Sequence, residues 1–295
     1  YGDWSSDVCS SDLSPSGWRA PNDRPLAAPP KRPGAIRRQV SQAMQERQID
    51  LCVQYIKPGQ EELLPALANG KVDGLILQGP PLSDALQNVL GGLPAVWLLY
   101  QGSHNWGDRV QPDHRQVGVL AFNHFAEHAR PPLCCMTYQP RIDAFDYWTE
   151  RAEAFAQRAR IGKIDHSVLG RDQAWCREDQ DRVAAARNLV KQFMALTPRP
   201  KGLFLAMNDL GRFIVEELAR CGIRAMEDVC LISGDAESAY RPIKPETITV
   251  DIRSVEVGFQ AVGTLLSRIA YPALPRMTTL VEPRLIIPGA FREAQ

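Results

Sequence analysis

The stretch GLFLAMNDLGRFIVEELARCGIRAMEDVCLISGDAES, residues 202–238, decides the fold. Leu203–Ala206 is a short apolar run, which is typical of a buried strand. Apolar residues then recur at helical spacing as far as Cys221-Gly222, where the glycine provides a helix stop. Val229–Ile232 is the next apolar run and reads as a second strand. The stretch therefore predicts a βαβ unit.

Polar residues directly follow both strands of this unit. Asn208 and Asp209 come after the first strand, and Gly234-Asp235 comes after the second. Ligands of open parallel sheets bind in the crevice beyond the carboxyl ends of the strands. Asn208 and Asp235 are therefore expected to meet at one site, whereas Asp209 immediately precedes the helix and is expected to cap it.

The same alternation of strand and helix extends through the chain from Gly34. The strands are continuous apolar runs rather than alternating ones, which is typical of a parallel sheet covered on both faces. The fold class is thus α/β, with enough elements for two doubly wound parallel-sheet lobes. The expected strands are 50–56, 72–77, 95–100, 133–138, 164–169, 203–206, 229–232, 248–251 and 278–287. The expected helices are 36–48, 61–68, 84–90, 115–129, 146–160, 179–196, 210–220 and 255–270, with a loop over 102–114. Pro283 and Pro288 indicate that the last strand material lies at sheet edges.

Composition excludes several classes of protein. The formal net charge is zero, with 34 basic and 34 acidic residues, which argues against a broad nucleic-acid surface on this chain. No run of about 18 apolar residues is present, so no membrane span is expected. The start lacks a basic segment followed by an apolar one, so no signal peptide is expected. Seven cysteines without a CxxC pair indicate reduced thiols and a cytoplasmic protein.

Residues 1–33 are expected to stand outside the fold. They show no hydrophobic periodicity and are rich in Ser, Asp and Pro. The opening GDWSSDVCSSDL resembles translated sequencing adapter, so the segment is interpreted as an artefact, with a natural disordered tail as the alternative.

The order of motifs resembles the effector-binding region of the LacI/GalR family of bacterial transcription regulators. The matching motifs are VDGLIL at 72–77, the pattern formed by Asp113, Gly118, Ala121 and His124, the R-x-x-G-F element present as Arg151, Ala154 and Phe155, FLAMND at 204–209, DVCLISGD at 228–235, and the segment from Ile248 to Gly258. The resemblance implies a type I periplasmic-binding-protein fold, in which two interleaved lobes enclose a ligand cleft. The lobes are expected at 34–138 plus 252–277 and at 139–251 plus 278–295.

The sequence departs from the family pattern in three places. The family begins with a helix-turn-helix and a hinge helix, and neither is present here. The first strand of the N-terminal lobe is also missing, so the chain reads as truncated. Ser233-Gly234-Asp235-Ala236 lacks the aromatic residue and the second Asp of the family pattern, and glycine in place of the aromatic indicates a different or larger ligand pocket.

Five residues are candidates for ligand contact under this resemblance. Asn208 and Asp235 suit polyol recognition because an amide and a carboxylate can chelate adjacent hydroxyls, although both could instead serve loop hydrogen bonding. Arg151 would donate to sugar oxygens, with a solvated helix arginine as the alternative. Asp113 would support the cleft or merely cap a helix. Trp106 would stack on a sugar or merely pack its own loop.

No enzymatic site is expected. His124-Phe-Ala-Glu-His128 spells the inverted zincin pattern, yet no third metal ligand is evident downstream. No glycine-rich phosphate loop, nucleophile elbow or pair of carboxylates stands out. We therefore expect no catalytic residue, no metal and no cofactor.

The most consistent interpretation is the ligand-sensing and dimerisation region of a LacI-type regulator. A sugar or related polar effector would shift the population of conformations, and a homodimer would bind operator DNA only through the missing N-terminal domain. The alternative is a periplasmic sugar-binding protein of a transport system. A third interpretation, a small metallohydrolase, would use His124 and His128.

Overall fold

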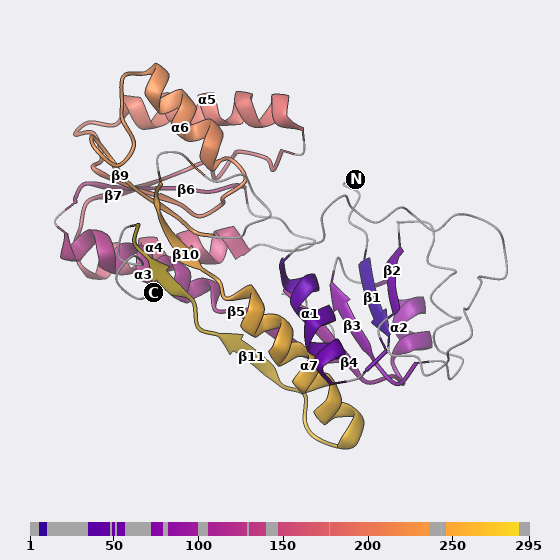
Figure 1. Ribbon diagram of the computed structural model, residues 1–295. Coiled ribbons are helices and arrows are strands. Elements are labelled where there is room, and N and C mark those ends of the chain that lie inside the picture. The colour runs from indigo at the N-terminus through magenta and orange to yellow at the C-terminus, as the bar shows by residue number, and fades with distance from the viewer. Residues whose placement is uncertain are drawn as a thin grey trace. The chain divides into compact units, whose positions relative to one another are not determined.

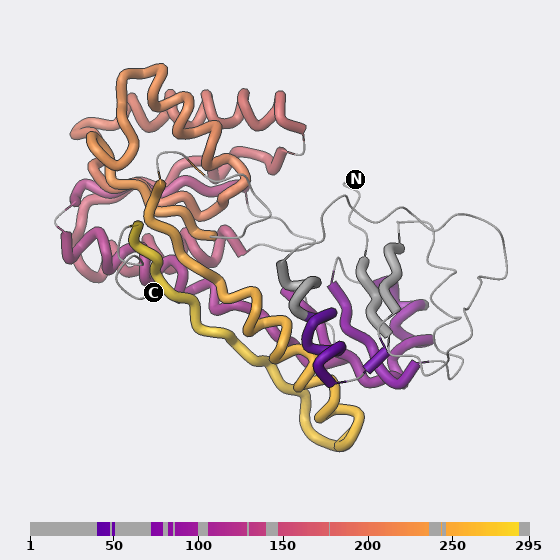
Figure 2. Tube along the Cα trace, viewed as in Figure 1, coloured from indigo at the N-terminus to yellow at the C-terminus, as the bar shows by residue number. Residues whose placement is uncertain are grey.

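The protein forms two units, each built around its own sheet (Figure 1). The computed structural model describes residues 6–10, 35–47, 49–50, 52–56, 72–78, 82–99, 106–128, 130–139, 147–176, 178–235, 243 and 246–288. Among these residues, unit 1 takes in the chain up to Pro112 together with Ser254–Val281, and unit 2 takes in the rest. The chain thus leaves unit 1, returns to it for one long helix and one strand, and leaves it again, as the trace in Figure 2 follows.

Unit 1 contains a six-stranded sheet in the order β11-β5-β4-β3-β1-β2. Its strands are β1 (Ser6–Ser10), β2 (Cys52–Ile56), β3 (Leu75–Gln78), β4 (Ala95–Leu98), β5 (Asp108–Pro112) and β11 (Thr278–Val281). Its helices are α1 (Ala35–Glu46), α2 (Asp84–Leu90) and α7 (Ser254–Ala270). Leu75 and Leu77 pack with α2, whereas Ile76 between them packs with α1 and α7. Both faces of the sheet are therefore covered, as the continuous apolar runs predict.

Unit 2 contains the second six-stranded sheet, in the order β12-β10-β9-β8-β6-β7. Its strands are β6 (Leu133–Met136), β7 (His166–Leu169), β8 (Gly202–Leu205), β9 (Cys230–Ser233), β10 (Ile248–Asp251) and β12 (Arg284–Ile286). Its helices are α3 (His114–Glu127), α4 (Tyr147–Ile161), α5 (Asp179–Ala195) and α6 (Gly211–Arg220). Helices α3 and α4 lie on one face and α5 and α6 on the other (Figure 1). Strands β6 to β10 pair in parallel, and the α/β fold class is confirmed.

The first correction concerns the N-terminal segment, which we expected to stand outside the fold. Ser6–Ser10 forms β1, which pairs antiparallel with both β2 and β3. It therefore lies between β2 and β3 in the sheet, so these five residues belong to the fold. Without it, β2 and β3 would each present a row of unpaired backbone groups, and an extended segment can satisfy those groups whatever its hydrophobic pattern. Periodicity alone could not reveal this strand.

The second correction concerns residues 102–114, which we expected to form a loop. They contain β5, which pairs in parallel with β4 and β11. The strand DRVQP carries a single aliphatic residue, Val110, and ends in proline, so it lacks the apolar run that marked the other strands. Its burial alternates along the strand.

The lobe boundaries also differ from those expected. Residues 113–138 were assigned to the first lobe, but β6 pairs with β7 and β8, so α3 and β6 belong to unit 2. Residues 278–287 were assigned to the second lobe as one strand. They divide into β11, which pairs with β5, and β12, which pairs with β10. Both are edge strands, as the prolines predict.

Most other elements agree with the sequence to within a few residues. Helix α2 and strand β10 match their expected ranges, and α6 ends at Arg220, two residues before Gly222, which has a φ of +77°. The helix expected over 61–68 lies outside the described residues. No helix in the described part of the chain combines the length and hydropathy needed to cross a bilayer.

Candidate functional site

The carboxyl ends of β8 and β9 bring Asn208 and Asp235 together in unit 2. Ser233, the last residue of β9, donates from its hydroxyl to Asn208 Oδ1 at 2.8 Å. The same hydroxyl lies 3.2 Å from the carbonyl oxygen of Asp235. Asp235 is buried and Asn208 is half-buried. The two predicted residues thus share one hydrogen-bonded cluster at the edge of the sheet where the strands end.

Arg151 joins this cluster from α4. Its side chain is only 1% exposed, although the sequence left open a solvated position. Its Nη1 donates to the carbonyl oxygen of Ala206 at 3.0 Å, and its Nη2 lies 3.8 Å from Asp235 Oδ2. The guanidinium also lies over the Tyr147 ring, 4.7 Å from the centroid. A buried cation needs such partners because the loss of its hydration would otherwise make burial unfavourable.

His114 completes the surroundings of Arg151, and the sequence analysis missed it. Arg151 Nε donates to His114 Nδ1 at 3.3 Å, and Nη2 lies 3.2 Å from the same nitrogen. The imidazole stacks on Tyr147 with 5.1 Å between the ring centroids. Burial, followed by the charge of Arg151, holds the pKa of His114 well below its ordinary value. Its place beside the expected cap Asp113 was the only sequence signal.

Asp113 caps helix α3, the structural alternative that the sequence left open. Its carboxylate accepts a hydrogen bond from the backbone N–H of Gln116 at 2.9 Å. The residue lies directly after β5, so it too is at a strand carboxyl end. The cap fixes the start of α3 and with it the neighbouring His114.

Trp106 belongs to unit 1, where it precedes the amino end of β5. Its Nε1 donates to the carbonyl oxygen of Leu93 at 3.0 Å, and its ring meets that of Trp97 edge-on at 6.0 Å. It lines a pocket of about 260 Å³ beside the amino end of β4. Ligands of parallel sheets bind at the opposite edge, so this geometry favours the packing interpretation of Trp106.

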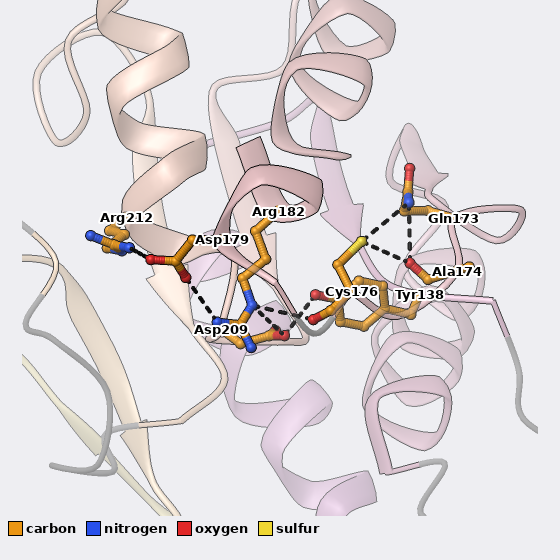
Figure 3. A network of polar contacts seen from close by, with 8 residues as sticks. All are labelled: Tyr138, Gln173, Ala174, Cys176, Asp179, Arg182, Asp209 and Arg212. Carbon is orange, nitrogen blue, oxygen red and sulfur yellow. Dashed lines mark hydrogen bonds and ion pairs between the residues drawn. The ribbon is translucent and has the colours of Figure 1, made fainter. Parts of the chain in front are cut away.

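Asp209 belongs to a second polar network at the strand ends of unit 2 (Figure 3). Tyr138, which follows β6, donates from its hydroxyl to Asp209 Oδ2 at 2.8 Å. Arg182 Nε lies 4.0 Å from the same oxygen and donates to the carbonyl of Cys176. Asp179 then bridges Arg182 and Arg212. This network ties α5 and α6 to the end of β6.

The expectation that Asp209 caps α6 is corrected by this arrangement. Leu210 occupies the N-cap position, without a side-chain cap. Burial raises the pKa of the Asp209 carboxyl, while the Tyr138 hydrogen bond and Arg182 act in the opposite direction. The carboxylate accepts from the tyrosine because that partner approaches from β6, which sequence spacing does not reveal.

The comparisons with known proteins agree with this architecture. Residues 134–289, which are more than half of the chain, match the family described as the periplasmic binding protein-like domain. The chain belongs to this family. The transcriptional repressor PurR of Photobacterium profundum is 20% identical over 231 residues, which are 77% of this chain and 67% of PurR. The chain thus spans about two thirds of the length of that curated relative.

Solved structures of LacI-type regulators share the fold. A regulator from Enterococcus faecium with bound ribose is 18% identical, with a TM-score of 0.64 over 86% of this chain and 91% of that one. A periplasmic binding protein/LacI regulator from Alkaliphilus metalliredigens, complexed with D-xylulofuranose, is 16% identical, with a TM-score of 0.64 over 85% and 91%. The motif order and these matches make the chain similar to the effector-binding domains of LacI-type regulators. Its relatives are regulators rather than enzymes.

The replacement of the family aromatic by Gly234 now has a physical reason. A Cβ at this position would lie 2.9 Å from the Leu205 carbonyl oxygen and 3.3 Å from Arg151 Nη1. The space is therefore filled by the neighbouring strand and by the guanidinium. Glycine thus lets the Leu205 carbonyl and Arg151 approach closely at this point, while the different or larger ligand pocket stays a prediction.

The two histidines of the inverted zincin pattern contact each other. The rings of His124 and His128 stack with their centroids 4.2 Å apart. Nδ1 of His128 lies 2.8 Å from the carbonyl oxygen of His124. Burial and the neighbouring His128 lower the pKa of His124. Within the described ranges, no three histidine, cysteine or carboxylate side chains gather as a metal site would require.

Proposed function

We propose that this chain is the effector-sensing region of a DNA-binding regulator and that its effector is a sugar or a related small polar molecule. The observation that carries the proposal is the cluster of Asn208, Asp235 and Arg151 at the strand ends of unit 2. These positions match the family motifs, and their side chains offer complementary donors and acceptors.

The chemistry of the cluster suits adjacent hydroxyl groups. Ser233 occupies the amide oxygen of Asn208, which leaves its N–H₂ as the group that can donate to a ligand hydroxyl. The Asp235 carboxylate is an acceptor and can receive hydrogen bonds from two hydroxyls. The Arg151 guanidinium forms an ion pair with that carboxylate at 3.8 Å. Ribose and D-xylulofuranose, which two structural relatives bind, present such hydroxyl pairs.

In the full-length protein, effector binding would control affinity for operator DNA. A ligand shifts a conformational equilibrium only by its difference in affinity for the two states. The protein would act as a cytoplasmic homodimer whose N-terminal helix-turn-helix domains contact the operator. The genomic sequence upstream of this reading frame tests that part: a helix-turn-helix supports it, whereas a signal peptide would favour a periplasmic sugar-binding protein. Sedimentation of the protein would test the dimer.

Titration calorimetry of a monosaccharide panel that includes ribose and D-xylulose tests the effector class. We expect one sugar to bind the wild type and Asp235→Asn to weaken that binding at least about tenfold, because a charge-assisted hydrogen bond is worth about 1.5–3 kcal/mol. Asp165→Asn is the matched control, since Asp165 is exposed and precedes β7 at the opposite edge. Equal affinity of Asp235→Asn and wild type would refute the site.

A further inference from the structure

Among the residues that the structure describes, His114 is the one buried titratable side chain that contacts Arg151 without belonging to the residues expected to touch the effector. It is 4% exposed and lies at the first position of α3. Three other groups surround the guanidinium: the Tyr147 ring from α4, the Ala206 carbonyl after β8, and the Asp235 carboxylate after β9. The imidazole is the partner contributed by α3.

The direction of this hydrogen bond fixes the protonation state of the His114 imidazole. A guanidinium has only donors, so Nδ1 of His114 must accept, and a nitrogen that accepts carries no proton. The ring is therefore neutral, with its proton on Nε2. Two arginine nitrogens, Nε and Nη2, converge on this one acceptor at 3.3 and 3.2 Å. Without it, the Nε–H of a buried cation would lose its partner.

We propose that His114 is a positioning residue, whose neutral imidazole holds the Arg151 guanidinium beside Asp235. The inference deepens the proposed function, on which its consequence for effector binding rests. The Nη2 that points to Asp235 also contacts the imidazole, so the two contacts fix one orientation of the planar fork. A guanidinium released from His114 would be free to turn away from the carboxylate.

Protonation would convert this acceptor into a donor that faces two other donors. The charged groups near the ring are Arg151 on α4 and Asp235 beyond it, while the neighbours of His114 on its own helix are engaged elsewhere. Asp113 accepts from the Gln116 backbone, and Arg115 donates to Gln157. Burial and the positive charge of Arg151 both lower the pKa of His114, so the contact is intact at neutral pH. Acidification then disrupts it and weakens effector binding.

Two isosteric variants separate the acceptor from the shape of the side chain. His114→Asn places an amide oxygen near the position of Nδ1 and does not titrate, whereas His114→Leu has similar size and no acceptor. His166→Asn is the matched histidine control, because His166 lies on β7 and its ring contacts the carbonyl of Ile164. Circular dichroism of each variant of the 295-residue chain would establish that the variant is folded.

Nitrogen NMR of the chain labelled in histidine and arginine detects the hydrogen bond between Arg151 and His114 without any effector. We expect a neutral His114 ring with Nδ1 unprotonated at about pH 6.5, where an ordinary histidine is half charged. We also expect the Arg151 Nε–H to exchange at least about tenfold faster in His114→Leu than in wild type or His114→Asn, because one net hydrogen bond is lost. A proton on Nδ1, or equal exchange in all three proteins, would overturn the assignment.

Calorimetry with D-ribose then measures how the His114 variants change effector affinity. At about pH 7.5 we expect His114→Leu to bind about tenfold more weakly than wild type and His114→Asn to bind nearly as well. From about pH 7.5 down to about pH 6.5, the ordinary pKa of histidine, affinity should change equally in wild type and in His114→Asn, and the additional fall in wild type should begin only at lower pH, because the pKa of His114 is lowered. Equal affinity of His114→Leu and wild type would contradict the proposal. Failure of ribose to bind any of them would count against the proposed sugar effector, and the NMR result alone would decide the role of His114.

Discussion

Arg151 illustrates how a single buried charge depends on several parts of the chain. The register of Arg151 and Phe155 identifies the arginine as a site candidate, but its partners come from α3, from α4 and from the ends of β8 and β9. Removing a charged group from water is costly unless its hydrogen bonds are replaced. The residues that replace them, above all His114, are distant in sequence and could not be predicted from spacing.

Arg268 in unit 1 pairs with a buried charge that likewise needs its hydrogen-bond partners, and this pair permits a test of stability. Its Nε and Nη2 form two hydrogen bonds with the Asp108 carboxylate at 2.9 and 2.8 Å, and its remaining hydrogens reach the carbonyls of Pro272, Leu274 and Pro275. Asp108 is fully buried. Arg268→Gln should reduce the free energy of unfolding by about 3–5 kcal/mol, because Asp108 is left as an uncompensated buried charge.

Urea denaturation followed by circular dichroism measures this loss. The control is Arg284→Gln, which removes a half-exposed arginine paired with Asp251 at 2.9 Å. An exposed pair contributes about 0–1 kcal/mol, so the control should remain close to wild type. Equal effects of the two substitutions would show that the Asp108 pair is not a principal stabilising contact.

At the scale of elements, the packing of α3 on α4 positions the site. A Cβ on Gly118 would lie only 2.0 Å from the Arg151 carbonyl oxygen and 3.0 Å from the Phe155 nitrogen. The two helix backbones thus approach as closely as glycine permits. His114 and Arg151 lie on these two helices, so their side chains meet because the helices touch here.

Gly118→Ala should therefore destabilise the protein, and Gly263→Ala should stabilise it. The first substitution forces the helices apart, at a cost of about 1–3 kcal/mol for overpacking. Gly263 lies within α7, and a Cβ added there would meet none of the described residues within 4 Å beyond its own helix backbone. Alanine at this position should add about 0.5–1 kcal/mol through its higher helix propensity. Thermal denaturation of both variants checks the opposite signs, and a shift in the same direction for both would contradict the packing argument.

At the scale of the whole molecule, each unit has its own core around its own sheet. The core of unit 2 is one continuous cluster, whereas that of unit 1 divides into two clusters on the two faces of its sheet. The proposed effector residues Asn208, Asp235 and Arg151 all lie in unit 2. An effector that binds the folded protein alone must stabilise it by mass action.

Saturating sugar should accordingly raise the melting temperature of the wild type. At 100 times the dissociation constant, the stabilisation is about 2.7 kcal/mol. The Asp235→Asn variant should show a much smaller shift at the same sugar concentration, and Asp165→Asn should match the wild type. Differential scanning calorimetry over a series of concentrations measures the effect. A shift of equal size in the Asp235→Asn variant would place the effector elsewhere.

The sequence by itself determined the α/β class, the order of most elements and the strand-end positions of Asn208 and Asp235. Apolar runs, helical spacing and glycine stops are local, so they can be read without the fold. The tertiary structure decided which strands share a sheet, because β1, β5 and β11 are defined by their partners rather than by their own pattern. It also decided that Arg151 approaches Gly234 closely, that Asp209 accepts a hydrogen bond from Tyr138, and that His114 accepts one from Arg151. Those contacts join residues from separate elements, and only packing brings such residues within hydrogen-bond distance.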